Sequence, residues 1–169
     1  LATLLGRCGY IRPVLEFGSS RVMPPSTNTP MGMTSMLATT HFISVIARTR
    51  LDHDDIGKIE AAIRTQMDTV GANLNKAIDG AEALFKAHGI TAQATYDTVP
   101  MDIEVHVLSS ISRRFLELLG KLDQLMPLLQ TLEIHEVITA QAVDLQRAGL
   151  KRQVRDIANG ARNFAIGLR

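Results

Sequence analysis

Three stretches of the chain repeat apolar residues in alternating steps of three and four positions. They span residues 56–84, 111–132 and 150–168. Such steps place a continuous apolar stripe along one side of an α-helix. We therefore predict three long amphipathic helices, over residues 54–88, from 109 or 110 towards 131, and from about 140 to the end of the chain.

Glycine and proline residues interrupt these predicted helices. Gly71 and Gly80 lie inside the first helix, and each weakens it relative to alanine, so we expect a bend or a break near one of them. Gly89 follows the first helix and suits a left-handed cap at its end. Pro127 lies inside the second stripe, where it removes a backbone donor and is expected to kink or split the helix.

Two shorter segments favour β-strands, Phe42–Leu51 and Met101–Leu108. In the second segment Ile103, Val105 and Val107 share one face, and polar residues occupy the other. Alternation of this kind is typical of a half-buried strand. We predict a small antiparallel two-stranded β element, which makes the fold class α+β and predominantly α-helical.

The chain divides into two parts by composition. Residues 1–40 include a stretch rich in Pro, Ser, Thr and Gly and are expected to form a flexible N-terminal arm, whereas residues 41–169 are expected to form a single domain. We interpret the first 22 residues as vector-derived or upstream-translated sequence, with Met23, Met31 or Met33 as candidate native starts.

Composition bears on the cellular setting and on chemistry. The formal net charge is +1 and the single cysteine, Cys8, excludes an internal disulfide, which fits a cytoplasmic protein. No apolar run approaches the length of a membrane span. The sequence contains no glycine-rich phosphate loop after a strand, no nucleophile elbow and no paired metal-ligand spacing. We expect no enzymatic activity, no metal and no cofactor.

Charge differs between the first and last predicted helices. Residues 52–88 contain seven acidic and four basic residues, a net charge of −3, whereas residues 140–169 contain six basic and two acidic residues, a net charge of +4. The basic helix, with Lys151, Arg152 and Arg155 as candidate contacts, could bind the phosphates of double-stranded DNA. Alternatively, it complements the acidic helix, within one chain or across a dimer.

The first predicted strand offers a second candidate site. Ser44, Arg48 and Arg50 lie on one face of it, as residues of a β-ribbon in the major groove would. If the two strands pair with their polar faces together, Arg48 or Arg50 instead meets Glu104 as a cross-strand ion pair. The sequence leaves both arrangements open.

Residues from about 39 to the end resemble the AcaB-like family of regulators encoded on conjugative plasmids and integrating conjugative elements. The resemblance lies in HFISVIARTRL, in DHDDIGKIEAAI and above all in SSISRRFLELLGKLDQLMPLLQTLEIHEVITAQ. It implies a ribbon-helix-helix-like homodimer that binds DNA in transcription. It would make Phe42–Leu51 the ribbon strand, with Ser44, Arg48 and Arg50 contacting bases.

Two functions follow as hypotheses. The first is a dimeric, DNA-binding transcriptional regulator of a mobile genetic element. The second is a non-enzymatic helical scaffold or accessory protein of a conjugative element, which acts through protein–protein contacts.

Overall fold

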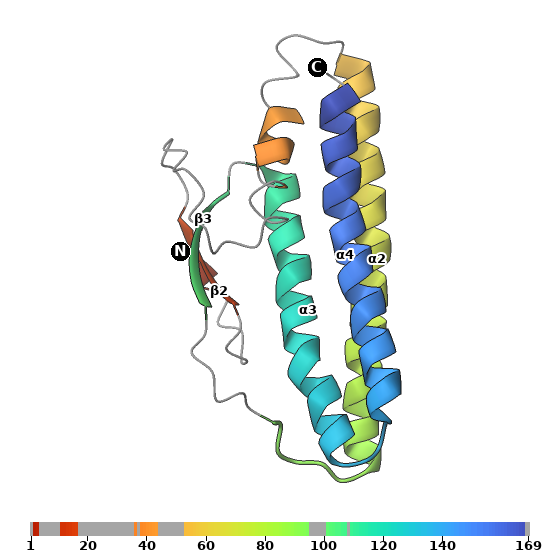
Figure 1. The fold of residues 1–169 in the computed structure, drawn as a ribbon. Helices are drawn as coiled ribbons and strands as arrows, with labels where there is room; N and C mark the ends of the chain where they lie inside the picture. The colour runs from red at the N-terminus through yellow and green to blue at the C-terminus, as the bar shows by residue number, and fades with distance from the viewer. Residues whose placement is uncertain are drawn as a thin grey trace.

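Three long helices form the packed part of the protein in a computed structural model. The structure describes residues 2–3, 11–16, 36, 38–43, 53–94, 101–107 and 109–167. Helix α2 spans His53–Ala87, α3 spans Ser110–Ile134 and α4 spans Ala140–Gly167. In Figure 1 the three lie side by side, with α2 and α3 running in the same direction and α4 returning antiparallel to both. The three helices lie close to their predicted positions.

Helix α2 is continuous over 35 residues, so a break at its glycines is not present. Asp54 and Asp55 occupy its first turn and Lys86 its last, where each charge interacts favourably with the helix dipole. Gly89 follows with a φ of 65°, as predicted. Gly71 is buried, and a Cβ added there would lie 3.3 Å from Leu118 Cδ2 of α3. The missing side chain therefore allows α3 to approach closely.

The three apolar stripes meet in one core. Fully buried residues of the core include Leu74 of α2, Leu132 of α3 and Ile157 of α4. Met36 and Ile43 of the short helical segment near residues 38–43 join them. Phe164, which the third stripe placed inside, is 38% exposed. The division of the chain at residue 40 stays a prediction.

Pro127 lies inside α3, and the helix continues through it without a break. The proline is buried among the helices. One turn later, the Thr131 hydroxyl donates to the Pro127 carbonyl at 2.7 Å and accepts from the Ala94 amide at 2.9 Å. Tertiary packing of the surrounding stripe therefore offsets the local cost of the proline, and the predicted split is wrong.

The predicted α+β, ribbon-helix-helix-like fold class is also wrong. Phe42 and Ile43, the first residues of the predicted ribbon strand, are helical, and residues 44–51 lie outside the described part of the chain. Met36, Thr40 and Ile43 are each fully buried. Their i, i+4, i+7 spacing places them on one face of a helix, and burial of that face overrides the alternating pattern.

The described strands also differ from the expected antiparallel pair of 42–51 with 101–108. Strand β3, Met101–His106, pairs in parallel with β2, Ile11–Glu16. Strand β1, Ala2–Thr3, pairs with β2 in the antiparallel direction. The neighbour of β3 is thus distant in sequence, and local alternation carries no information about it.

Replacing Leu125 with alanine is expected to lower the free energy of unfolding by about 2–5 kcal/mol, because its fully buried side chain would leave a cavity. The matched control is Leu145→Ala, where the side chain is 68% exposed and the change should stay within about 0.5 kcal/mol. Urea denaturation followed by circular dichroism measures both. Equal effects would contradict the described core.

Gly80→Ala is expected to raise the free energy of unfolding by about 0.5–1 kcal/mol, because a Cβ there meets nothing within 4 Å. Gly71→Ala should gain less or lose stability, because the new methyl group crowds Leu118. The same denaturation experiment compares the two variants. A larger gain at Gly71 than at Gly80 would show that α3 does not pack closely there.

Candidate nucleic-acid interface

The part of α4 from residue 150 onward exposes four cations. Lys151, Arg152 and Arg155, the predicted contacts, are all exposed, and Arg162 is exposed two turns further along. None of the four makes a hydrogen bond or an ion pair with any residue that the structure describes. Residues 150–167 contain a single acidic residue, Asp156, so four cations against one acid leave this part of the helix with a net charge of +3.

Several cations elsewhere in the bundle are paired. On α2, Lys58 lies 3.0 Å from Asp55 and Arg64 lies 3.8 Å from Glu60. On α3, Arg113 lies 3.1 Å from Glu117, and Arg114 reaches across to Asp68 of α2. Ion pairs of this kind account for those cations within the fold, in contrast to the four on α4.

The first arginine of α4 has a structural role. Arg147 has a side chain only 18% exposed. It donates to Gln130 Oε1 at 2.8 Å and to the Met126 carbonyl at 3.5 Å, and it lies 4.0 Å from Asp144. These bonds join α4 to α3. Arg147 therefore holds α4 against α3, whereas the four exposed cations of α4 face solvent.

The structure does not show the acidic and basic helices pairing within the chain through those four cations. A polar contact between α2 and α4 is a hydrogen bond between side-chain amides, in which Asn73 Nδ2 donates to Gln153 Oε1 at 3.0 Å. The apolar stripes supply the rest of the described α2–α4 packing. Pairing of the basic helix of one protomer with the acidic helix of another stays a prediction.

Arg152 lies opposite the buried stripe of α4, and the other three cations lie along one flank of that stripe. At about 100° per residue, Lys151, Arg155 and Arg162 fall within an arc of about 40°, and Arg152 lies further outward. Val154 and Ile157, on the other side, are buried in the core. The rise of about 1.5 Å per residue spreads the cations over about 16 Å of helix. The result is a straight cationic edge on a helix held in place by its apolar face.

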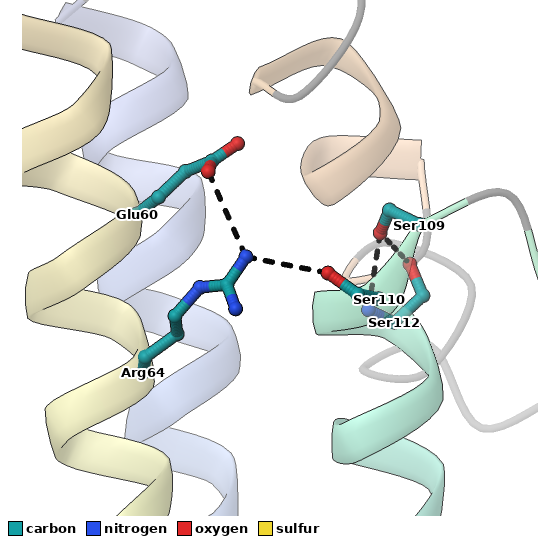
Figure 2. A network of polar contacts seen from close by, with 5 residues as sticks. All are labelled: Glu60, Arg64, Ser109, Ser110 and Ser112. Atoms are coloured by element: carbon teal, nitrogen blue, oxygen red, sulfur yellow. Dashed lines mark hydrogen bonds and ion pairs between the residues drawn. The ribbon is translucent and has the colours of Figure 1, made fainter.

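A polar network at the start of α3 is satisfied internally, as Figure 2 shows. Ser109 caps the helix, since its Oγ accepts from the Ser112 amide at 3.1 Å, and the two hydroxyls lie 2.7 Å apart. Thr40 bonds to Ser112 from the short helical segment. Arg64 Nη2 donates to Ser110 Oγ at 3.3 Å while it pairs with Glu60. These bonds fix α3 against its neighbours.

The other predicted contacts lie outside this geometry. Ser44, Arg48 and Arg50 fall outside the described residues. Glu104 lies on β3, where only the backbone is described. Whether Arg48 or Arg50 contacts DNA or forms an ion pair with Glu104 therefore stays a prediction.

Arg162 is the cation that the predicted set omitted. It lies seven residues after Arg155, and this spacing in the sequence already places the two on one helical face.

A metal site has little support in the described part of the chain. It contains no group of three or more His, Cys, Asp or Glu residues placed to hold a metal ion. An open hollow of about 400 Å³ lies between α2, α3 and α4. Its lining is mostly apolar and includes Lys76. Among the described helices, none combines the length and apolar character that a membrane crossing requires.

No protein-family model and no curated protein matches the chain. A solved structure does: selenomethionine-containing AcaB from uropathogenic E. coli, with a TM-score of 0.66. The two sequences are 26% identical, and the match covers 80% of this chain and 68% of AcaB. Fold and sequence therefore support an AcaB-like relationship, in agreement with the resemblance drawn from the sequence.

Proposed function

We propose that this protein is a DNA-binding regulator of a mobile genetic element, and that it contacts double-stranded DNA through the exposed cations of α4. The observation that carries the proposal is the set Lys151, Arg152, Arg155 and Arg162, which is exposed and has no partner among the described residues. The AcaB-like relationship supports a regulatory role. Ser44, Arg48 and Arg50 remain further candidate contacts.

The physical basis is the release of counterions from the duplex. Each phosphate that a lysine or arginine neutralises releases condensed cations. The logarithm of the binding constant therefore falls linearly with the logarithm of the salt concentration. An arginine already paired with a carboxylate contributes little, because it must first lose that partner. Four unpaired cations within 12 residues therefore favour α4 over the paired cations of α2 and α3, and over α2 with its two unpaired lysines, Lys76 and Lys86.

The triple variant Lys151→Gln/Arg155→Gln/Arg162→Gln is expected to reduce the salt dependence of duplex binding by about 2–3 in the log–log slope, since each lost phosphate contact removes about 0.9. Fluorescence anisotropy with a labelled duplex, titrated at several salt concentrations, measures the slope. The matched control is Lys76→Gln/Lys86→Gln on α2, where both lysines are exposed and unpaired among the described residues.

The control should keep the wild-type slope. Circular dichroism confirms that each variant retains its helical signal. Absence of salt-dependent binding by the wild-type protein, or an unchanged slope in the triple variant, would rule out α4 as the DNA contact.

A second candidate function is that of a helical accessory protein that acts through protein contacts. The observation in its favour is the exposure of large apolar side chains: Ile134 at 61%, Leu145 at 68% and Ile166 at 61%. Exposed apolar side chains can take part in protein contacts, but these three do not form one continuous patch, since Leu145 and Ile166 lie about 30 Å apart along α4. The two functions can be distinguished by experiment, since only the first requires duplex binding by the isolated protein.

The homodimer implied by the resemblance belongs to the proposed DNA-binding function. Analytical ultracentrifugation tests it: a dimer has twice the 18.5 kDa mass of the chain.

A further inference from the structure

The open hollow between the three long helices exists because α2 carries small side chains there. Its volume is about 400 Å³, within the range of about 300–1,000 Å³ that is typical of ligand pockets. Ala77, Gly80 and Ala81 of α2 line it. A Cβ added at Gly80 would meet nothing within 4 Å, so no side chain of α3 or α4 fills the space at this position.

The floor of the hollow belongs to the hydrophobic core. Leu129 and Leu132 of α3 are fully buried, and Leu150 of α4 is buried as well. Ile138, in the connection between these two helices, also lines the hollow. In Figure 1 this is the end of the bundle where α3 passes into α4. Because the core fixes the floor, the hollow presents a preformed apolar surface.

One charged group lies at this apolar surface. Lys76 lines the hollow. It is exposed and makes no hydrogen bond or ion pair with any described residue. Gln146 of α4 adds a side-chain amide to the lining, and no carboxylate is present among the described residues there. The hollow therefore favours an anionic group beside Lys76.

The acidic residues closest to this lining in the sequence lie outside it. Asp79 follows Lys76 by three residues and falls about 60° from it around α2, on the side away from Gly80. Asp144 on α4 lies 4.0 Å from Arg147. On α3, Glu133 accepts a hydrogen bond from Gln130 at 3.1 Å. None of the three acids lines the hollow.

The chemistry of the lining separates the candidate occupants. A nucleotide carries several negative charges and a base, whereas the lining has one cation and no aromatic side chain for stacking. A second protomer would require an apolar surface that continues beyond the hollow, but the neighbouring exposed residues of α2 include Asp79 and Glu82. A hydrocarbon chain with a single carboxylate matches both the apolar floor and Lys76.

We propose that the hollow binds an aliphatic carboxylate, with its chain on the leucine floor and its carboxylate beside Lys76. The chain would cover Leu129, Leu132 and Leu150 from water, and the Lys76 ammonium would neutralise the carboxylate. This binding site goes beyond the proposed DNA contact on α4, and neither depends on the other. Loss of duplex binding would leave the hollow unaffected, and the converse also holds.

Calorimetric titration of the full chain with hexanoate, octanoate and decanoate tests the apolar part of the site. The concentrations stay below those at which micelles form. Burial of each further methylene is expected to raise the affinity by about twofold to fourfold. Decanol, which has the same chain length as decanoate and no charge, should bind more weakly than decanoate.

Lys76→Met tests the cation, since methionine keeps an unbranched side chain without the charge. The variant should bind decanoate about twofold to fivefold more weakly than the wild type and should bind decanol equally well. Lys86→Met is the matched control, because Lys86 is also exposed on α2 and does not line the hollow. It should keep the wild-type affinity for decanoate.

Gly80→Leu tests the space itself, because the new side chain would fill the hollow. It should weaken decanoate binding at least about tenfold. Gly57→Leu is the matched control on the same helix, since a Cβ at Gly57 also meets nothing within 4 Å and Gly57 does not line the hollow. Leucine favours a helix more than glycine does, so circular dichroism should show both variants folded. If Gly80→Leu does not fold, the Lys76→Met comparison decides.

Three results would overturn the proposal. The first is that the wild type binds none of the three carboxylates. The second is that Lys76→Met binds decanoate as tightly as the wild type does. The third is that decanoate fails to bind while Gly80→Leu changes the mass of the protein in analytical ultracentrifugation, which would make the hollow a contact between protomers.

Discussion

Burial of the α4 apolar stripe against α2 and α3 is the interaction on which the rest of the structure depends. Ile157 and Ala161 are fully buried within it, and their burial fixes how α4 is rotated about its axis. Once that rotation is fixed, every other residue of the helix has an assigned direction. The cations at 151, 152, 155 and 162 face solvent as a consequence, and Arg147 faces α3.

The same constraint explains why the charge on α4 is divided. Arg147 lies where α4 meets α3, so its guanidinium donates to Gln130 and to the Met126 carbonyl. Bonds of this kind fix the relative positions of two helices but leave no free charge. The described residues offer the arginines further along the helix no partner. Packing and the candidate DNA contact are therefore supplied by different residues of one helix, and each set can be altered separately.

Much of the helical part of the fold could be predicted from the sequence, because a 3.6-residue period is a local property. The start of α3 illustrates this, since the helix begins at Ser110, within the predicted range, with Ser109 as its cap. The segment from Phe42 could not be predicted in the same way. Its alternation favours a strand, but burial of Ile43 together with Met36 and Thr40 makes its first residues helical. The partner of β3 and the tolerance of Pro127 also depend on contacts distant in sequence.

The candidate site, like the fold, could be predicted from the sequence only in part. The positions of Lys151, Arg152 and Arg155 on a basic helix could be predicted from spacing, and so could that of Arg162. Their freedom from partners could not, because the alternative of pairing with acidic α2 depends on how the two helices are oriented in three dimensions. The Asn73–Gln153 bond shows that neutral groups meet at that interface instead.

Amine-reactive labelling of the protein with and without duplex DNA tests the central claim most directly, namely that DNA contacts the solvent-facing side of α4 while its apolar side stays in the core. Lys151, Lys76 and Lys86 are all exposed in the described structure, so all three should be labelled in the free protein. The account predicts that duplex protects Lys151 strongly and leaves Lys76 and Lys86 as reactive as before, as mass spectrometry would measure. Equal protection of the three lysines, or none at Lys151 under conditions where duplex is bound, would contradict it.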